Sequence, residues 1–156
     1  MISQILLETD LEPGRLELEI TESVMLYGTA AILQTLTSIK ALGISISMDD
    51  FGTGYASLAY LNSFPFDKIK IDRSFINDLN RKEKANAIVR SVISLGRSLS
   101  MTINAEGVET LEQLSFLTAE GCEQVQGYYF GRPMCAHDLS ALIDDGRYSM
   151  PVGAAA

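Results

Sequence analysis

Short apolar segments and amphipathic helical segments alternate along most of this chain. Helical periodicity is broken at glycine and proline, as at Gly43 after one apolar-faced helix. Near-strict alternation of this kind implies right-handed parallel βαβ units. The pattern therefore predicts an α/β fold with strands over 16–20, 44–48, 68–71, 101–105 and 123–126, and helices over 29–42, 56–61, 84–99, 110–119 and 136–144.

Polar side chains come at the end of each predicted strand. In a parallel α/β fold the carboxyl ends of all strands lie on one face, so residues distant in sequence converge there. Loops after strands are commonly polar, but that alternative explains one or two such residues better than a set at five consecutive strands. We therefore expect a functional site formed by Glu19, Glu22, Asp49, Asp50, Lys70, Asp72, Glu106, Glu109 and Gln126.

Asp49 and Asp50 are the most informative members of this set. They follow the apolar run 44–48 and precede a Gly-Thr-Gly segment at 52–54. Crowding two like charges is costly unless a metal or a basic group compensates them, and Mg²⁺ and Mn²⁺ prefer oxygen ligands. A solvated acidic turn is the alternative for an isolated pair. The other strand-end carboxylates favour the cation site.

Charge and composition narrow the chemistry further. The 156 residues are 47% hydrophobic, enough for a core, and carry a net charge of −8, which argues against a general binder of DNA or RNA backbones. Cys122, Cys135 and His137 are the only cysteines and histidine, and their spacing supports neither zinc nor Ser-His or Cys-His catalysis. We expect a reduced, cytoplasmic environment, with no membrane segment and no signal region in this chain.

Several carboxylates without histidine suit a pair of Mg²⁺ or Mn²⁺ ions that clamp the attacking and leaving oxygens of a phosphoryl displacement. Lys70 would hold water or neutralise phosphate charge there, although a strand-end lysine is also an ordinary ion-pair partner. Arg132 and Pro133, which follow the aromatic segment 127–131, offer a guanidinium and ring faces for a nucleotide. The alternative for that segment is a loop that packs its aromatic rings against the end of a barrel.

Five segments in order resemble successive motifs of the EAL domain, a family of bacterial cyclic di-GMP phosphodiesterases on a modified (β/α)₈ barrel. They are Leu-Glu-Leu-Glu-Ile-Thr-Glu-Ser at 16–23, Met-Asp-Asp-Phe-Gly-Thr-Gly-Tyr-Ala-Ser-Leu at 48–58, Lys-Ile-Asp-Arg-Ser-Phe at 70–75, Ala-Glu-Gly-Val-Glu-Thr at 105–110 and Gln-Gly-Tyr-Tyr-Phe-Gly-Arg-Pro at 126–133. The Glu-Ala-Leu signature and the asparagine-bearing strand of the family are absent. The resemblance thus implies a partial barrel without its N-terminal strands: a truncated EAL domain at 1–146 and an unstructured tail at 147–156.

The resemblance also implies a role for each strand-end residue. The catalytic set would be Asp49, Asp50, Lys70 and Glu106, with Lys70 orienting the hydrolytic water. Two Mg²⁺ or Mn²⁺ ions would be held, and Ca²⁺ would inhibit. Glu19 would ligate the first metal, Asp49 would bridge both, and Asp50 and Glu106 would ligate the second. Glu22 would steady the loop at 50–56 and couple it to dimerisation. The substrate would be bound by Glu109, Gln126, Arg132 and Pro133.

The implied reaction is hydrolysis of cyclic di-GMP to linear pGpG in the intact parent. Because two ligands of the first metal would be missing, we expect little activity from this chain alone. We also expect it to self-associate, as a dimer, through its open sheet edges.

One alternative is a degenerate EAL module that acts as a cyclic di-GMP receptor or protein-interaction domain, although the site residues are intact. A receiver-like domain is another, but Lys70 comes too early for it and Glu106 and Gln126 would have no role. Asn104 occupies a position that is usually apolar in the family.

Overall fold

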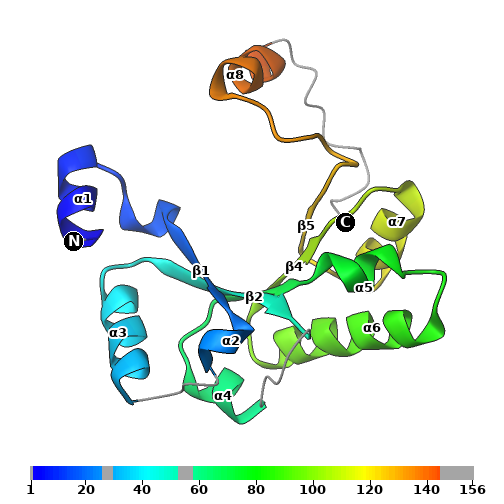
Figure 1. Ribbon diagram of the computed structural model, residues 1–156, viewed down its shortest axis with the longest axis horizontal. Helices are drawn as coiled ribbons and strands as arrows, with labels where there is room; N and C mark the ends of the chain where they lie inside the picture. Colours follow the sequence, from blue (N-terminus) through cyan, green and yellow to red (C-terminus); the bar gives the residue numbers. More distant parts are fainter. Residues whose placement is uncertain (1, 26–29, 53–57, 145–156) are drawn as a thin grey trace.

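A computed structural model describes residues 2–25, 30–52 and 58–144 of the chain. Five strands form one sheet in the order β1-β2-β3-β4-β5, and all four neighbouring pairs are parallel. This confirms the predicted α/β fold, which is a partial barrel (Figure 1). The strands are β1 Glu17–Thr21, β2 Ser45–Phe51, β3 Lys68–Ile71, β4 Thr102–Glu106 and β5 Gln124–Gln126.

Helices connect successive strands and cover one face of the sheet (Figure 1). Helix α6 contacts β3 and β4, and α3 contacts β2. Figure 1 also shows α8 standing away from the sheet at the end of an extended segment. The helices are α1 Ile2–Thr9, the 3₁₀ turn η1 Pro13–Arg15, α2 Glu22–Met25, α3 Ala30–Ala41, α4 Leu58–Ser63, α5 Arg73–Asn77, α6 Glu83–Ser98, α7 Leu111–Ala119 and α8 Ala136–Asp144.

The two faces of the sheet differ in chemistry because alternate residues of a strand point to opposite sides. Ile46, Ile69 and Ile103 are at most 2% exposed and join the core with side chains of the covering helices, such as Val89 of α6 and Leu117 of α7. The opposite face carries polar residues from every strand. It includes Glu17, Glu19, Ser47, Asp49, Lys68, Lys70, Asn104, Glu106, Gln124 and Gln126.

Strand β2 is longer than predicted. It continues through Phe51, so Asp49 and Asp50 lie within its last residues rather than after it. Pairing with β3 shifts register between Met48 and Phe51, and Asp50 has a φ of 56°. A bulge with a left-handed residue allows a strand to continue past an irregularity and re-aims nearby side chains. The prediction that β2 ends at residue 48 was therefore wrong, and the adjacent acidic pair is part of this bulge.

Two short helices were not predicted. The helices α2 and α5 span 4 and 5 residues, too few for a periodic pattern to stand out. The Gly-rich segment at 53–57 and the predicted tail at 147–156 lie outside the described residues, as does the domain boundary at 146. No helix in the described ranges is both long enough and apolar enough to cross a membrane. Self-association through the outer edges of β1 and β5 stays a prediction.

Candidate functional site

Lys70 is the centre of the site. It projects from the polar face of β3, and its side chain is only 6% exposed. Its Nζ lies 2.6 Å from Oε1 of Glu19, 3.1 Å from Oδ1 of Asp49 and 2.7 Å from Oε1 of Glu106. Glu19 belongs to β1, Asp49 to β2 and Glu106 to β4. Side chains from four consecutive strands therefore meet at one nitrogen atom.

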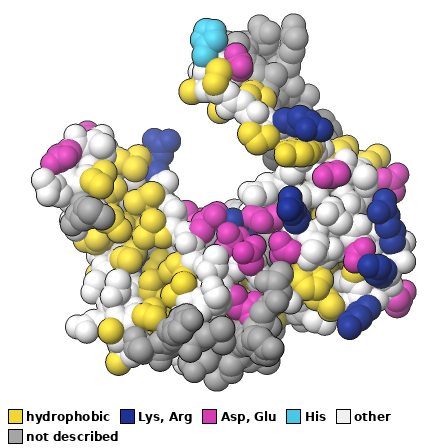
Figure 2. Space-filling view, viewed as in Figure 1, with side chains coloured by type: hydrophobic (Ala, Val, Ile, Leu, Met, Phe, Trp, Pro, Cys, Tyr) yellow, Lys and Arg dark blue, Asp and Glu magenta, His cyan; other side chains and the backbone are white. Residues whose placement is uncertain are grey.

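The electrostatic balance at this point is negative. Burial alone would lower the pKa of Lys70, but its hydrogen bonds with Glu106, Glu19 and Asp49 outweigh that effect and raise the pKa, so the ammonium stays charged. One positive charge then faces three carboxylates. Acidic side chains gather around a basic one in the hollow above the sheet (Figure 2). A site with this excess of negative charge favours the binding of a further cation.

Asp50 adds to the negative charge. Burial, followed by the nearby negative charges of Asp49 and Asp72, raises its pKa. Its backbone N–H donates to Oδ1 of Asp49 at 3.1 Å, which orients that carboxylate. Asp72 has a different role at the start of α5, where its Oδ1 accepts a hydrogen bond from the backbone N–H of Ser74 at 3.0 Å. Burial opposes the ionisation of Asp72, but the bonds from Ser74 prevail and lower its pKa.

A pair of amide side chains continues the site from Glu106 toward β5. Gln126 Nε2 donates to Glu106 Oε1 at 2.9 Å, and Asn104 Nδ2 donates to Gln126 Oε1 at 3.3 Å. Asn104 lies two residues before Glu106 on the same face of β4 and is 7% exposed. Sequence reasoning assigned no role to Asn104. Its position in the alternation of β4, on the side of Glu106, was the signal that could have placed it here.

Glu22, the first residue of α2, contacts the residue that follows β2. The side chain is 4% exposed, and its Oε2 accepts a hydrogen bond from the backbone N–H of Gly52 at 3.2 Å. Gly52 is the residue that leads into the segment 53–57. The contact therefore fixes the position of Gly52.

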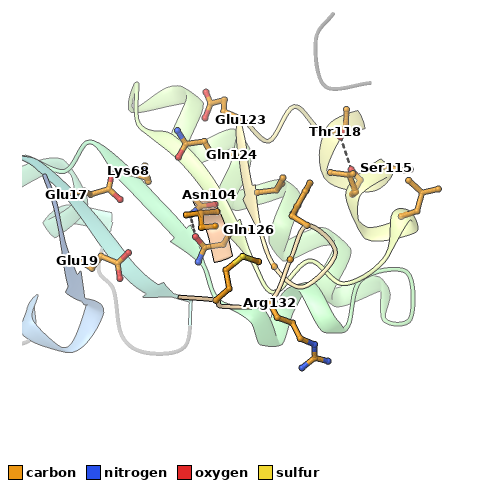
Figure 3. Close-up of a pocket in the computed structure, with 18 of the residues that line it drawn as sticks. Glu17, Glu19, Lys68, Asn104, Ser115, Thr118, Glu123, Gln124, Gln126 and Arg132 are labelled. Carbon is orange, nitrogen blue, oxygen red and sulfur yellow. Dashed lines mark hydrogen bonds and ion pairs between the residues drawn. The ribbon is translucent and has the colours of Figure 1, made fainter. Parts of the chain in front are cut away.

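A cleft of about 1130 Å³ lies beside the cluster (Figure 3). Its lining includes Glu19, Lys68, Asn104 and Gln126 from the sheet, together with Arg132. The Arg132 guanidinium carbon lies 4.6 Å from the centre of the Tyr128 ring. Figure 3 shows this guanidinium directed away from Glu19.

Two of the predicted substrate-binding residues, Glu109 and Pro133, do not line the cleft. Among the described residues, neither Glu109 nor Pro133 belongs to the lining of this cleft. The backbone N–H of Glu109 donates to Gln113 Oε1 at 2.7 Å, next to the capping box that starts α7. The structure thus brings Gln126 and Arg132 to the cleft and leaves Glu109 and Pro133 outside it.

The donor atoms fit a hard divalent cation. Glu19, Asp49 and Glu106 already direct one oxygen each to a single cationic nitrogen, and carboxylate oxygens are the ligands that Mg²⁺ and Mn²⁺ prefer. Within the part of the chain that the structure describes, no group of three or more His, Cys, Asp or Glu side chains is arranged as a ready metal site. The three carboxylates are instead paired with the ammonium of Lys70. The residues therefore match a divalent metal in chemistry, with Lys70 as their partner in this structure.

A partial α/β barrel with an acidic site at the carboxyl ends of its strands defines the class of protein. The EAL domain family model matches residues 1–133, so the chain belongs to the EAL domain family. Among proteins, the chain is 54% identical over 133 residues to an uncharacterised signalling protein of Caulobacter vibrioides, covering 85% of this chain and 16% of that one. It is 47% identical over 142 residues to the bifunctional diguanylate cyclase/cyclic di-GMP phosphodiesterase MucR of Pseudomonas aeruginosa, covering 91% and 21%.

Solved structures agree with this assignment. The MucR phosphodiesterase in complex with c-di-GMP superimposes with a TM-score of 0.85 at 48% identity, covering 88% of this chain and 56% of that one. BlrP1 of Klebsiella pneumoniae, solved with manganese and c-di-GMP, gives a TM-score of 0.79 at 35% identity, covering 85% and 34%. The chain thus spans only about a fifth of MucR and corresponds to part of an EAL domain.

Proposed function

We propose that this chain forms the strand-end site of a cyclic di-GMP phosphodiesterase domain, which hydrolyses one phosphodiester bond of cyclic di-GMP to give linear pGpG. The observation that carries the proposal is the convergence of Glu19, Asp49 and Glu106 on Lys70 at the carboxyl ends of parallel strands. The relatives support it, because MucR is named as a cyclic di-GMP phosphodiesterase and BlrP1 was solved with c-di-GMP and either manganese or calcium.

Two Mg²⁺ or Mn²⁺ ions are the proposed cofactors. Glu19 and Asp49 would hold one, and Asp49, Asp50 and Glu106 the other. When bound, such ions polarise the phosphoryl oxygen, lower the pKa of water and stabilise the leaving oxygen. Ca²⁺ prefers longer and less regular coordination than Mg²⁺. We therefore expect Ca²⁺ to support binding of cyclic di-GMP but not its hydrolysis.

Lys70 would act on water and phosphate directly. Because its pKa is raised, the ammonium donates hydrogen bonds and does not serve as a base. It would orient the water whose oxygen bonds to phosphorus, and it would offset the negative charge of the phosphate. One P–O bond forms with water as the P–O bond to the ribose oxygen breaks, and that oxygen takes up a proton. A carboxylate beside Lys70 would accept the proton that the attacking water loses.

Substrate binding would use the cleft beside this cluster. Arg132 supplies a guanidinium stacked on Tyr128, and Gln126 supplies an amide already bonded to Glu106. Glu109 and Pro133 stay proposed substrate residues that the cleft does not include. Glu22 would hold the start of the segment at 53–57 through Gly52.

Ligand binding without hydrolysis is the second candidate. One observation favours it: the described sheet has five strands, whereas a whole (β/α)₈ barrel has eight. The family ligands expected on additional strands are absent from these residues. In that case the chain would act as a cyclic di-GMP receptor or as an interaction surface.

Incubation with cyclic di-GMP and Mn²⁺, followed by chromatography of the products, tests the proposal. We expect slow conversion to linear pGpG, at a small fraction of the rate of the P. aeruginosa MucR phosphodiesterase, and suppression by Ca²⁺. A product other than linear pGpG would contradict the proposed reaction. A rate equal to that of MucR would contradict the expectation that a partial barrel loses most of its activity.

A further inference from the structure

The orientation of two amide side chains follows from one carboxylate. Glu106, when ionised, only accepts hydrogen bonds, so Gln126 must present its amino group, Nε2, to it. The carbonyl oxygen of Gln126 then faces Asn104, which must in turn present its own amino group, Nδ2. The ionised Glu106 therefore determines which atom donates in both hydrogen bonds. This also assigns the amide orientations of Gln126 and Asn104, which geometry alone leaves ambiguous.

The backbone register places these three side chains within reach of one another. In the β4–β5 pair, Asn104 is opposite Gln124 and Glu106 is opposite Gln126. On one face of the sheet, Glu106 therefore lies directly across from Gln126 and Asn104 lies diagonally from it. Gln126 itself is exposed at the outer strand of the described sheet, so it needs a partner to keep one orientation.

Asn104 is buried for a polar residue, and only its amino group is used. Its side chain is 7% exposed, and its Oδ1 meets no hydrogen-bond donor among the described residues. An apolar residue of the same shape would avoid burying that oxygen. The hydrogen bond that Asn104 donates to Gln126 is thus the one polar contact of its side chain among the described residues.

Glu106 receives its two donors on a single atom. Lys70 Nζ and Gln126 Nε2 both contact Oε1, at 2.7 Å and 2.9 Å. Two donors from different strands hold this oxygen in place, while Oε2 takes part in neither bond. Partners of this kind, one step removed from a metal, commonly change metal affinity about 10- to 100-fold when they are replaced.

We propose that Asn104 is a positioning residue for the metal site: it holds the Gln126 amide so that Gln126 donates to Glu106 and keeps that carboxylate oriented for a divalent cation. The part that concerns the cation rests on the proposed function. Without the Asn104 donor, the Gln126 amide keeps only its contact with Glu106 and is free to swing away from it. Glu106 then loses one of its two fixed donors.

Two variants and one control test this proposal. Asn104→Leu keeps the shape of the side chain and removes its polar atoms. Asn104→Asp keeps shape and polarity but replaces the donor with an acceptor, so Gln126 should turn its amino group toward position 104. Thr102→Val is the matched control, because Thr102 lies on the same face of β4, two residues before Asn104.

The first readout is the NMR signal of the Gln126 side-chain amide in the metal-free chain. We expect one amide proton shifted downfield by Glu106 in the unmodified chain and in Thr102→Val, and a loss of that shift in Asn104→Leu and Asn104→Asp. A shift that persists in both Asn104 variants would overturn the proposal. The same spectra report whether each variant is folded.

The second readout is Mn²⁺ binding, followed by the electron paramagnetic resonance of free Mn²⁺. We expect Asn104→Leu to bind about 10-fold more weakly than the unmodified chain and Thr102→Val to bind equally. Equal binding by Asn104→Leu would overturn the link to the cation. Failure of the unmodified chain to bind Mn²⁺ would contradict the proposed function as well as that link. The metal-free NMR comparison would still decide whether Asn104 orients Gln126.

Discussion

Replacing Lys70 with methionine is expected to lower the melting temperature of the metal-free chain by roughly 6–12 °C, which corresponds to about 3 kcal/mol. Methionine keeps an unbranched apolar stem but removes the ammonium that Glu19, Asp49 and Glu106 share. The three carboxylates would then repel one another across β1, β2 and β4. Part of that repulsion is relieved by solvent, because the Glu19 side chain is 50% exposed, and this limits the expected loss.

The control for this change is Lys82→Met. Lys82 forms an exposed pair with Asp78 at 2.7 Å, with 66% of its side chain accessible, so its replacement should change stability by less than about 0.5 kcal/mol. Added Mn²⁺ should raise the melting temperature of Lys70→Met more than that of the unmodified chain, since a cation can replace the lost ammonium. If Lys70→Met and the unmodified chain melted at the same temperature, the three ion pairs would not hold the strand ends together.

A methyl group at position 127 is the second change with a large expected effect. A Cβ on Gly127 would lie 2.2 Å from the backbone oxygen and 2.3 Å from the backbone nitrogen of Val108. Val108 is fully buried, and its N–H donates to the Gln126 oxygen at 3.0 Å. Backbone atoms cannot give way as a flexible side chain does, so Gly127→Ala must separate these two segments. We expect a loss of about 3 kcal/mol, or roughly 6–12 °C by calorimetry.

Gly131→Ala is the matched control in the same segment. A Cβ there would meet only the end of Met134, at 4.0 Å, so we expect a change below about 0.5 kcal/mol. Because Gln126 precedes Gly127 directly, the displacement in Gly127→Ala should also weaken the Gln126 bond to Glu106. Equal melting temperatures for the two alanine variants would contradict the close packing of this turn against Val108.

The sheet was predictable because each strand is a short segment in which apolar and polar residues alternate, bounded by turn residues, a pattern that local sequence alone carries. All five predicted strands are present, in consecutive parallel order. The bulge in β2 was not predictable, since the left-handed φ of Asp50 depends on pairing with β3, which is set by residues about 20 positions away. Helices of four or five residues, such as α2 and α5, also carry too little periodicity to be recognised.

The site was predictable in outline and not in its contacts. The rule that parallel strands end on one face was enough to expect Glu19, Asp49, Lys70 and Glu106 together, and the structure brings them within 3.1 Å of a common atom. The roles proposed for them rest on the family and stay to be tested. Sequence could not show that Lys70 is central to the cluster, because that depends on side-chain length and direction across four strands.

Binding of cyclic di-GMP in the presence of Ca²⁺, measured by isothermal titration calorimetry, tests the central claim most directly. Calcium is chosen so that binding is measured without hydrolysis. The comparison is between the unmodified chain, Asp49→Asn and Asp78→Asn, since Asp78 lies in an exposed pair with Lys82 away from the cluster. We predict binding by the unmodified chain and by Asp78→Asn, and its loss in Asp49→Asn. Equal binding by all three, or binding by none, would contradict a metal-dependent cyclic di-GMP site at these strand ends.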